Sequence, residues 1–477
     1  MRFIGNAPVD GEVRAIASGA LATGEAVIVN ADGTVSVISS TIGTASIFQE
    51  ANSSYIGSDF DSNSNKVVVA YQVGTTGMCV VGTVSGTSIS FGTPVEFSSI
   101  ETYYNSVVFD SSNSKVVVAY APADGGGYFY GTARVGTVSG TSISFGTATV
   151  FESAASEYIS AIFDSNSNKV VIAYRDSPNS DSGTAVVGTV SGTSISFGSP
   201  VVYNSGTTDW VSATFDSNSN KVVIAYRDVS NSAYGTAIVG TVSGTSISFG
   251  SEVVFEAAQV RHNSLTFDSN SNKVVIAYRD QSNSGFGTAI VGTVSGTSIS
   301  FGTPVVFESA ALEYIGSAFN SSSNTVFLAY NDVGNSDYGT AIVGTVSGTS
   351  ISFGTPFVFE SGDTRYINSV YDSNSSVMAI VYADSGNAAY GTSIVVDVGG
   401  VDRPLTSENF VGFANSGYAD GQSAAINSTC SVDNKQSGLT AGQTYYVQTD
   451  GSLGTTPASP SVVAGTAISS NSIIVKG

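Results

Sequence analysis

The sequence has little positive charge: 16 Lys and Arg stand against 37 Asp and Glu, which gives a formal net charge of −21. Proteins that bind nucleic acids neutralise phosphates with clustered Lys and Arg, so this balance argues against a nucleic-acid partner. Cysteine and histidine are also scarce. Cys79 and Cys430 are too few for a disulfide framework, and with His262, the single His, they do not supply the four ligands of a structural zinc site.

Long apolar runs are missing too. No stretch approaches about 18 uninterrupted apolar residues, and residues 1–24 lack a basic segment followed by an apolar one. We therefore expect a soluble protein with no membrane insertion and no cleavable secretion signal. Charged residues make up only 11% of the chain, whereas Gly (53), Tyr (23) and Phe (25) are abundant, which is typical of all-β proteins with many turns.

What the sequence does contain is a repeat. The run Phe-Asp-Ser-Asn-Ser-Asn-Lys-Val-Val-Ile-Ala-Tyr, or a close variant, occurs seven times, about every 52 residues, and this period indicates one structural unit repeated along the chain. Its leading aromatic residues are Phe60, Phe109, Phe163, Phe215, Phe267, Phe319 and Tyr371. A second run, Val-Gly-Thr-Val-Ser-Gly-Thr-Ser-Ile-Ser-Phe-Gly, occurs six times, and a seventh copy is missing near Val395.

Each unit predicts four strands separated by clusters of Gly, Asn, Asp and Ser. In the third unit they span roughly residues 158–164, 169–175, 184–190 and 194–203. The second of these strands is apolar on both faces, as expected for a strand that lies between two neighbouring sheets. Four strands in each of seven units, with no helical pattern, predict an all-β, seven-bladed β-propeller of four-stranded blades.

A propeller has to close, and the N-terminal segment offers the strand that the last unit lacks. Residues 33–48 align without a gap on residues 188–203 of the third unit. Closure by this strand removes the exposed edges of an open ring. The predicted organisation is an N-terminal β segment (1–32), a propeller (33–398, with 33–50 completing the last blade) and a small C-terminal β-domain (399–477).

The two segments outside the predicted ring resemble each other. Leu21–Gly33 and Leu439–Gly451 both predict a strand that ends in an Asp-Gly hairpin turn. Because the closing strand brings the two termini together, we predict that they build one small β-domain. The alternative is two independent tails.

The residues at the C-terminus also resemble a known family. Gly438–Leu453, followed by Val462–Ile468 and Ile473–Lys476, is similar to a small module near the C-termini of virion proteins of tailed bacteriophages, marine ones especially. The repeated Gly-Thr-Val-Ser-Gly-Thr-Ser-Ile-Ser-Phe-Gly run resembles propeller repeats of such phage proteins and of some bacterial surface proteins. The resemblance covers most of the chain, implies a location in the virion and brings no functional residues with it.

Signatures of enzymes are sparse. A single His allows at most one Ser-His-Asp or Cys-His arrangement, and no Gly-x-Ser-x-Gly motif accompanies it. The Ser-x-Asp-x-Gly-x-Thr-Trp boxes of sialidase-like propellers are absent as well. Paired carboxylates, such as Glu152 with Glu157 or Glu308 with Glu313, remain as candidates for flanking a glycosidic bond. We predict a protein that is not an enzyme.

The Asp-Ser-Asn-Ser-Asn run at residues 164–168 allows two interpretations. Alternating oxygen side chains begin a calcium-binding loop, but the Gly at its sixth position and the Glu at its twelfth are missing here. Asp and Asn also cap hairpin turns by accepting hydrogen bonds from nearby backbone amides. We favour the turn and predict no cofactor, with calcium as the alternative.

The repeats vary on one face only. The turns between the first and second and between the third and fourth strands are nearly constant, whereas the other loops, which share the opposite face of each blade, differ. On that variable face an aromatic residue stands five residues before each leading aromatic. These residues are Tyr55, Tyr104, Tyr158, Trp210, His262, Tyr314 and Tyr366.

A planar ring beside variable polar groups is a common way to hold sugars or partner side chains. The predicted ligand-binding residues are Tyr158, Trp210, His262, Tyr314, Arg261, Asp209, Arg175, Arg227 and Arg279. The alternative is structural, with rings that wedge the blades apart and Arg and Asp side chains that form ion pairs between blades.

From these features and the resemblance we predict a non-enzymatic structural protein of a phage virion, a fibre, spike or surface decoration that binds a glycan or protein on the host surface. Other virion proteins would be its remaining partners, and we expect an oligomer within the virion. The alternatives are a lectin-like bacterial adhesin and a purely structural capsid or tail component.

Overall fold

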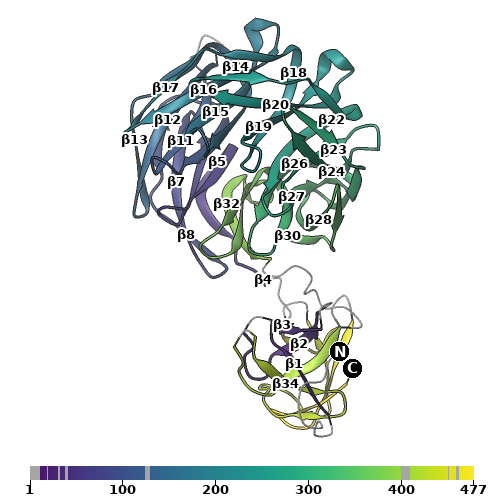
Figure 1. Cartoon of the computed structure of the whole chain (residues 1–477). Helices are drawn as coiled ribbons and strands as arrows, with labels where there is room; N and C mark the ends of the chain where they lie inside the picture. The colour runs from purple at the N-terminus through teal and green to yellow at the C-terminus, as the bar shows by residue number, and fades with distance from the viewer. Residues whose placement is uncertain are drawn as a thin grey trace. The chain divides into compact units, whose positions relative to one another are not determined.

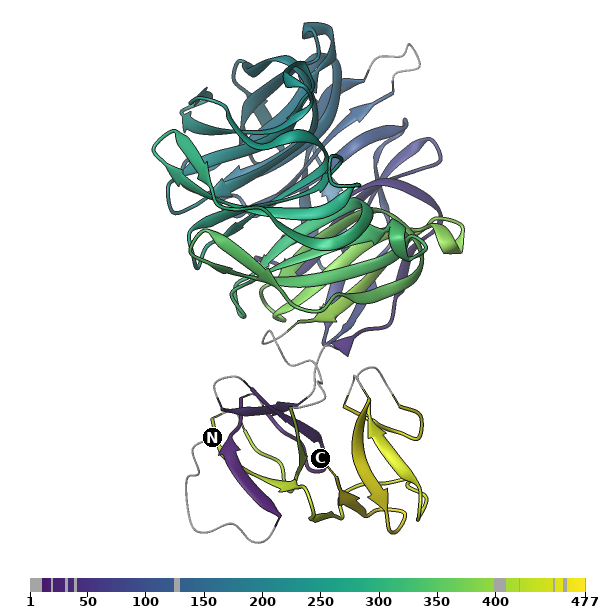
Figure 2. The ribbon, with the colours of Figure 1, turned by 90° about the vertical axis from the view of Figure 1, so that its right-hand side faces the viewer.

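The computed structural model describes residues 11–18, 20–30, 33–37, 41–123, 129–398, 409–419, 421–448, 451–457 and 461–476. The chain divides into two compact units. Ile42–Val396 form the first, which we call the ring domain, and Met1–Thr41 with Asp397–Gly477 form the second, which we call the terminal domain (Figures 1 and 2). No helix in the described part of the chain has the length and apolar character of a membrane span.

The third repeat shows how the ring domain is built. Strand β14 (Thr149–Asp164) pairs with β15 (Lys169–Asp176), β15 with β16 (Ser182–Ser191), and β16 with β17 (Ser194–Phe197), all antiparallel. The first half of β18 (Val201–Asp216) also pairs with β16, while its second half begins the next repeat. Each long strand therefore ends one repeat and is the inner strand of the next. The predicted all-β class is confirmed.

The other repeats follow the same plan, and we number the repeats one to seven by their inner strands. The inner strands are β5 (Ser46–Asp61), β10 (Thr102–Asp110), β14, β18, β22 (Val253–Asp268), β26 (Val305–Asn320) and β30 (Phe357–Asp372). The second strands are β6 (Lys66–Val73), β11 (Lys115–Pro122), β15, β19 (Lys221–Asp228), β23 (Lys273–Asp280), β27 (Thr325–Asp332) and β31 (Val377–Asp384).

The third strands are β7 (Thr76–Ser85), β12 (Tyr130–Ser139), β16, β20 (Tyr234–Ser243), β24 (Phe286–Ser295), β28 (Tyr338–Ser347) and β32 (Tyr390–Asp397). The short outer strands are β4 (Thr41–Ile42), β8 (Ser88–Phe91), β13 (Ser142–Phe145), β17, β21 (Ser246–Phe249), β25 (Ser298–Phe301) and β29 (Ser350–Phe353). Strand β9 (Val95–Ser98) is separate from β10 and pairs with β7, as the first halves of the long strands pair in other repeats. Single 3-10 turns follow four of the second strands: η1 (Ser177–Asn179), η2 (Val229–Asn231), η3 (Val333–Asn335) and η4 (Ser385–Asn387).

The hydrophobic core of the ring domain lies between the repeats. On β19, Val222, Ile224 and Tyr226 pack against the third repeat, whereas Val223 and Ala225 pack against the fifth. All five side chains are fully buried. The prediction that the second strand is apolar on both faces is confirmed, and each repeat completes the core of its two neighbours.

The first and last repeats meet through the N-terminal segment. The first half of β5 pairs with β32, so that Ser46 lies opposite Ser393 and Asn52 opposite Tyr390. From the same segment Phe48 enters a core shared by the first and seventh repeats. Val35–Val37, which the sequence assigns to the last blade, instead form β3 of the terminal domain, because a hairpin pairs them with β2 (Ala26–Val29). Residues 38–40 lie outside the described part of the chain.

A glycine explains why one turn is constant among the repeats. The Gly198 N–H donates to Val187 O (2.9 Å), and a Cβ atom at Gly198 would lie 1.8 Å from the backbone oxygen of Thr245. Thr245 belongs to the Ser-Gly-Thr-Ser turn of the next repeat. The turn and the glycine therefore form a close contact between repeats that leaves no room for a side chain.

The terminal domain contains two five-stranded sheets of the same topology. The first, in the order β1-β34-β33-β2-β3, combines strands from both ends of the chain. The second, in the order β35-β39-β38-β36-β37, comes from the C-terminal segment alone. The strands not yet bounded are β1 (Glu12–Ile16), β33 (Phe410–Ala414), β34 (Ser423–Ser428), β35 (Val432–Asp433), β36 (Thr444–Val447), β37 (Leu453–Gly454), β38 (Val462–Ala467) and β39 (Ile473–Val475).

The two sheets also share their register. Gly412 lies opposite Val27 and Ser428 in the first sheet, and Gly465 lies opposite Tyr445 and Val475 in the second. Equivalent hydrogen bonds also join the turn before β2 to the end of β33 and the turn before β36 to the end of β38. They run from Gly24 N to Ala414 O (2.7 Å) and from Gly442 N to Ala467 O (2.8 Å). We call the sheets the first and second modules, and they are two copies of one structure. Asp32 and Asp450 of the predicted Asp-Gly turns lie outside the described residues.

The duplication shows where the ring domain enters the chain. In the second module, residues 455–461 connect β37 to β38. In the first module, the equivalent connection from β3 to β33 contains the entire ring domain. The ring domain is therefore an insertion into one loop of a small β module.

Candidate functional site

Seven aromatic side chains, one from each inner strand, form a closed belt in the ring domain. Neighbouring rings are in contact all the way round, with centroids as close as 4.2 Å between Trp210 and His262, and Tyr366 closes the circle on Tyr55 at 5.2 Å. The members of this aromatic belt are Tyr55, Tyr104, Tyr158, Trp210, His262, Tyr314 and Tyr366. Four of the predicted ligand-binding residues belong to it.

Each belt residue lies in a β-bulge with a left-handed backbone. Its φ angle is between 49° and 54°, a region that non-glycine residues rarely adopt. In β18, for example, the pairing with β19 shifts between Asp209 and Ser212, around Trp210. A bulge redirects a side chain out of the ordinary alternation of a strand. Here it turns one ring from every repeat toward its neighbour's ring.

The belt is electrically neutral near neutral pH. Burial is the main cause that raises the pKa of Tyr55 to about 12, so its phenol keeps its proton. Burial, together with the nearby charges of Arg279 and Arg261, lowers the pKa of His262 to about 3. The Tyr314 N–H donates to Nδ1 of His262 (3.2 Å), which requires that nitrogen to be unprotonated. The belt offers ring surface and neutral polar groups.

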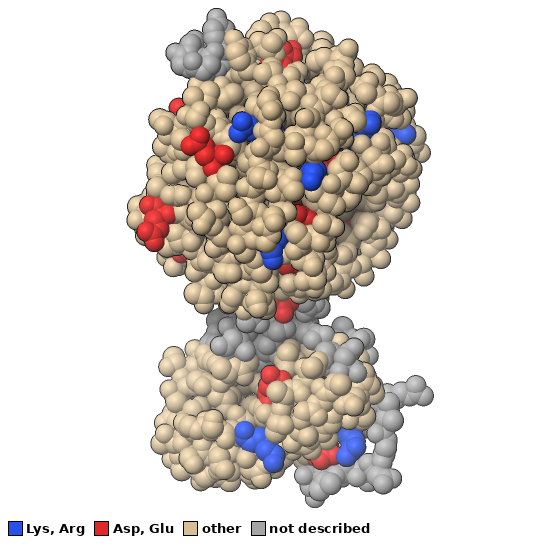
Figure 3. Space-filling view, turned by 90° about the vertical axis from the view of Figure 1, so that its left-hand side faces the viewer, with Lys and Arg blue, Asp and Glu red and all other residues tan. Residues whose placement is uncertain are grey.

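Polar side chains surround the belt and differ from repeat to repeat. The residue before each ring lies opposite a residue of the second strand, and three such pairs are Glu157 with Arg175, Asp209 with Arg227, and Arg261 with Arg279. Figure 3 shows that charged side chains are sparse and scattered over the face in view. Because the repeats are alike elsewhere, these pairs make the seven junctions chemically distinct.

Three of the predicted arginines have carboxylate partners. Arg175 reaches into the next repeat, with Nη1 2.6 Å from Oδ1 of Asp209, and Arg279 likewise contacts Glu313 of the next repeat (2.9 Å). Arg227 bonds the same Asp209 within its own repeat. The structural alternative, ion pairs between repeats, therefore accounts for Arg175 and Arg279. Arg261 is exposed to solvent.

The carboxylates considered for hydrolysis have separate structural partners. Glu152 and Glu308 each accept a hydrogen bond, both of 3.0 Å, from the hydroxyl group of a buried tyrosine, Tyr174 and Tyr330 respectively. Glu157 lies 3.8 Å from Arg175. The two tyrosine bonds tie the first half of a long strand, which ends one repeat, to the second strand of the next repeat.

The Asp-Ser-Asn-Ser-Asn turns also use their oxygens internally. Oδ1 of Asp164 accepts hydrogen bonds from the N–H groups of Asn166 (2.9 Å) and Ser167 (3.0 Å), and Oδ2 accepts one from the Ser167 hydroxyl (2.7 Å). These are the hydrogen bonds of the turn interpretation. Among the residues that the structure describes, no three His, Cys, Asp or Glu side chains are grouped as metal ligands.

A pocket of about 410 Å³ opens beside the belt, where the seventh repeat meets the first. Its lining combines one belt ring, Tyr366, with Arg365, Gln72 and small polar residues. This pocket is not among the sites predicted from the sequence. Two features of the sequence could have indicated it. Ala383 stands at a position where three other repeats have Arg, and the loop that follows Gln72 is short.

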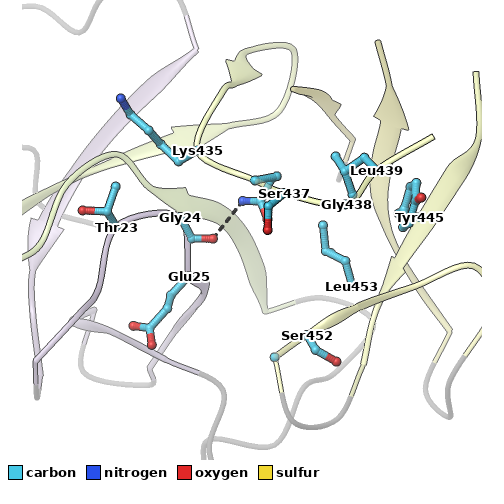
Figure 4. A pocket seen from close by; sticks show the side chains of 12 residues that line it. Thr23, Gly24, Glu25, Lys435, Ser437, Gly438, Leu439, Tyr445, Ser452 and Leu453 are labelled. Carbon is cyan, nitrogen blue, oxygen red and sulfur yellow. Dashed lines mark hydrogen bonds between the residues drawn. The ribbon is translucent and has the colours of Figure 1, made fainter. Parts of the chain in front are cut away.

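A second pocket, of about 370 Å³, lies in the terminal domain (Figure 4). Leu439, Tyr445 and Leu453 of the second module form its apolar side. Across it, the side-chain amide of Gln436 donates to the backbone oxygen of Gly24 in the first module (2.8 Å). This pocket marks a joint between the modules.

No family model and no curated protein sequence matches this chain. Among solved structures, the BP39L lectin of Burkholderia pseudomallei is similar with a TM-score of 0.56 and 11% identity, over 74% of this chain and 98% of the lectin. SapL1 lectin in complex with alpha methyl fucoside gives a TM-score of 0.39 and 13% identity, over 65% of this chain and 96% of that one. The periplasmic gluconolactonase PpgL of Pseudomonas aeruginosa gives 0.46 and 11%, over 70% and 97%. The first similarity shows a shared, propeller-like all-β fold.

Proposed function

We propose that the ring domain is a seven-bladed β-propeller that binds carbohydrate without catalysis, so that the chain acts as a lectin-like adhesin. The observation that carries the proposal is the closed aromatic belt, surrounded by polar side chains that differ between otherwise similar repeats. Ring faces pack against the C–H groups of a sugar, while amides, hydroxyls and guanidinium groups satisfy its hydroxyls. Both kinds of group lie on the one face where the repeats vary.

The charge of the chain favours an uncharged ligand. A net charge of −21 repels anionic surfaces at long range, so attachment depends on contacts at short range. The similar Burkholderia pseudomallei protein is a lectin, which supports glycan binding but not the charge of the ligand. Neutral glycans are the proposed partners.

A glycan array with the full chain tests this function. We expect binding to a subset of neutral glycans, and at least a tenfold loss in the combined variant Tyr366→Ala, Trp210→Ala, Arg227→Ala. The matched control changes three residues of the constant turns, Asn168→Ala, Ser191→Ala and Ser243→Ala, and keeps the binding. No glycan binding by the parent chain, or equal losses in both variants, overturns the proposal.

The virion setting is a separate proposal. It is supported by the resemblance of Gly438–Leu453 and the following segments to modules of tailed-phage virion proteins, with which a host-binding propeller is compatible. Mass spectrometry of purified particles tests it directly. Repeated failure to find the chain in particles whose genome encodes it would remove the virion setting and leave the lectin-like function untouched.

A further inference from the structure

We propose that the junction of the seventh and first repeats is a single saccharide site, selective for a neutral sugar ring rich in hydroxyl groups. The inference rests on the proposed carbohydrate-binding function and adds its location and ligand class. The pocket there, of about 410 Å³, is within the size range of small-ligand sites. It is lined by Asn52, Ser53, Ser54, Gln72, Gly74, Arg365, Tyr366, Ala383, Ser385 and Ala389.

The pocket exists first because Ala383 is short. At the same position of the second strand, Arg175 and Arg279 extend into the next repeat and form ion pairs there. Asn331 of the sixth repeat also reaches the next repeat, where its side-chain amide donates a hydrogen bond to Thr364 O (2.9 Å). The side chain of Ala383 ends at Cβ, so the space that these three residues fill at their own junctions stays open here.

A short turn in the first repeat opens the other side. In the fourth repeat, the loop after β19 folds back so that the Ser230 hydroxyl accepts a hydrogen bond from Thr207 N (2.9 Å), which covers the start of the inner strand. In the first repeat, β6 and β7 are joined by a tight turn at Gly74, with Val73 opposite Thr76. The equivalent residue of β5, Asn52, which precedes the inner half of that strand, is therefore exposed.

The polar groups of the pocket are held in place before any ligand arrives. The Gln72 side chain accepts a hydrogen bond from the Ser54 hydroxyl and donates one to Gly74 O (2.5 Å). The Arg365 guanidinium is fixed by Asp363, with Nη2 2.8 Å and Nε 3.2 Å from Oδ2. Groups that are already ordered lose little freedom on binding, which favours affinity.

The lining selects the class of ligand. Its polar side chains are hydroxyls and amides, which both donate and accept hydrogen bonds, and no carboxylate is among the lining residues. The one cation, Arg365, already has its counter-ion in Asp363. Tyr366 supplies a ring for a C–H face, and its contacts with Tyr55 (5.2 Å) and Tyr314 (5.3 Å) fix its orientation. A neutral pyranose satisfies all of these groups.

The decisive variant is Ala383→Arg, which introduces the residue found at this position in three other repeats and fills the pocket. With neutral methyl hexosides and a neutral glycan ligand from the array as probes, calorimetry of the parent chain should give one site per chain. Ala383→Arg should weaken that binding at least tenfold while the melting temperature stays within a few degrees of the parent. Ala121→Arg, the same change at the equivalent position of the second repeat, is the matched control and should keep the affinity.

Gln72→Ala provides a second variant in case the arginine disturbs the fold, and it should also weaken binding at least tenfold. Equal binding by the parent, Ala383→Arg and Gln72→Ala would overturn this site, while glycan binding by the parent would leave the proposed function standing. A stoichiometry of several sites, or a preference for sialylated or uronic-acid probes over neutral ones, would also overturn it. Failure of the parent to bind any glycan removes the function itself.

Discussion

Among the belt residues, His262 is the one that ordinarily titrates near neutral pH, so its charge state in the folded protein can be tested by measuring stability against pH. Its pKa in the folded protein is about 3, below the ordinary 6.5, so the unfolded chain binds the proton more tightly. The stability gained from a neutral, buried imidazole is complete above pH 6.5 and is lost as the pH falls toward 3.

Replacing His262 with Tyr, the residue at five of the seven belt positions, should remove this acid sensitivity. We expect the parent to lose up to about 1.4 kcal/mol more than His262→Tyr for each pH unit between 6.5 and 3. Urea unfolding curves at several pH values measure the difference. Parallel stability profiles for the two proteins would show that His262 is not held neutral by the belt.

At the same scale the sequence predicts residues better than contacts. The sequence shows the belt residues, from Tyr55 to Tyr366, because each stands five residues before a leading aromatic. Their closure into a belt depends on left-handed β-bulges, which this spacing does not reveal. The ion pair of Arg175 joins two repeats through Asp209, 34 positions away along the chain. Ion pairs and ligand binding are equally compatible with Arg175 in the sequence, and only the geometry of the folded chain separates them. The pocket was missed because its signal, Ala383, is the absence of a large side chain.

Among the elements, the first half of β5 matters most for closure, since its strand pairing with β32 joins the last repeat to the first. Phe48 anchors it, with its ring 5.1 Å from that of Tyr71 and 5.4 Å from that of Phe91. Phe255 occupies the equivalent place at an internal junction, 5.2 Å from Tyr278 and 5.8 Å from Phe301. The two phenylalanines therefore have similar surroundings but different roles in closure.

Phe48→Ala and Phe255→Ala should each destabilise the ring domain by about 3–5 kcal/mol, because each leaves a comparable cavity. Only Phe48→Ala should also release residues 41–52 for cleavage, since this segment is held to the seventh repeat by strand pairing and by that side chain. Limited proteolysis with mass spectrometry locates the cuts. Equal protection of residues 41–52 in both variants would mean that Phe48 does not hold the closure.

The strands themselves are largely readable from the sequence, and the one misassigned segment shows the limit. The segment Gly33–Ser36 has the Gly-Thr-Val-Ser sequence of the repeats. It also comes only a few residues after β2 in the chain. The observed hairpin pairs Val35 with Val29 over a short loop, whereas pairing with the seventh repeat joins residues far apart in the chain. Short loops cost less conformational entropy to close, so the local pairing has the advantage.

For the whole molecule, the duplicated module gives the ring domain its context. The likeness of Leu21–Gly33 to Leu439–Gly451 is visible in the sequence, but only strands β33 and β34 complete the first copy, and they lie beyond the ring domain. A module whose strands are separated by an entire domain leaves no continuous pattern to detect. Because the second module forms the same pairings over a short loop, the first module does not need the ring domain to define its fold.

This independence leads to a prediction about the terminal domain. Replacing residues 38–408 with residues 456–461, the equivalent loop of the second module, should leave a small protein that folds alone. The strands β2 and β33 would keep their pairing of Val27 with Gly412, and the core that unites Ile28 and Phe413 with Val447 would remain complete. Circular dichroism and a cooperative thermal transition would report folding. An unfolded product would mean that the two modules depend on the inserted ring, and that the terminal domain forms only after the ring has brought β3 and β33 together.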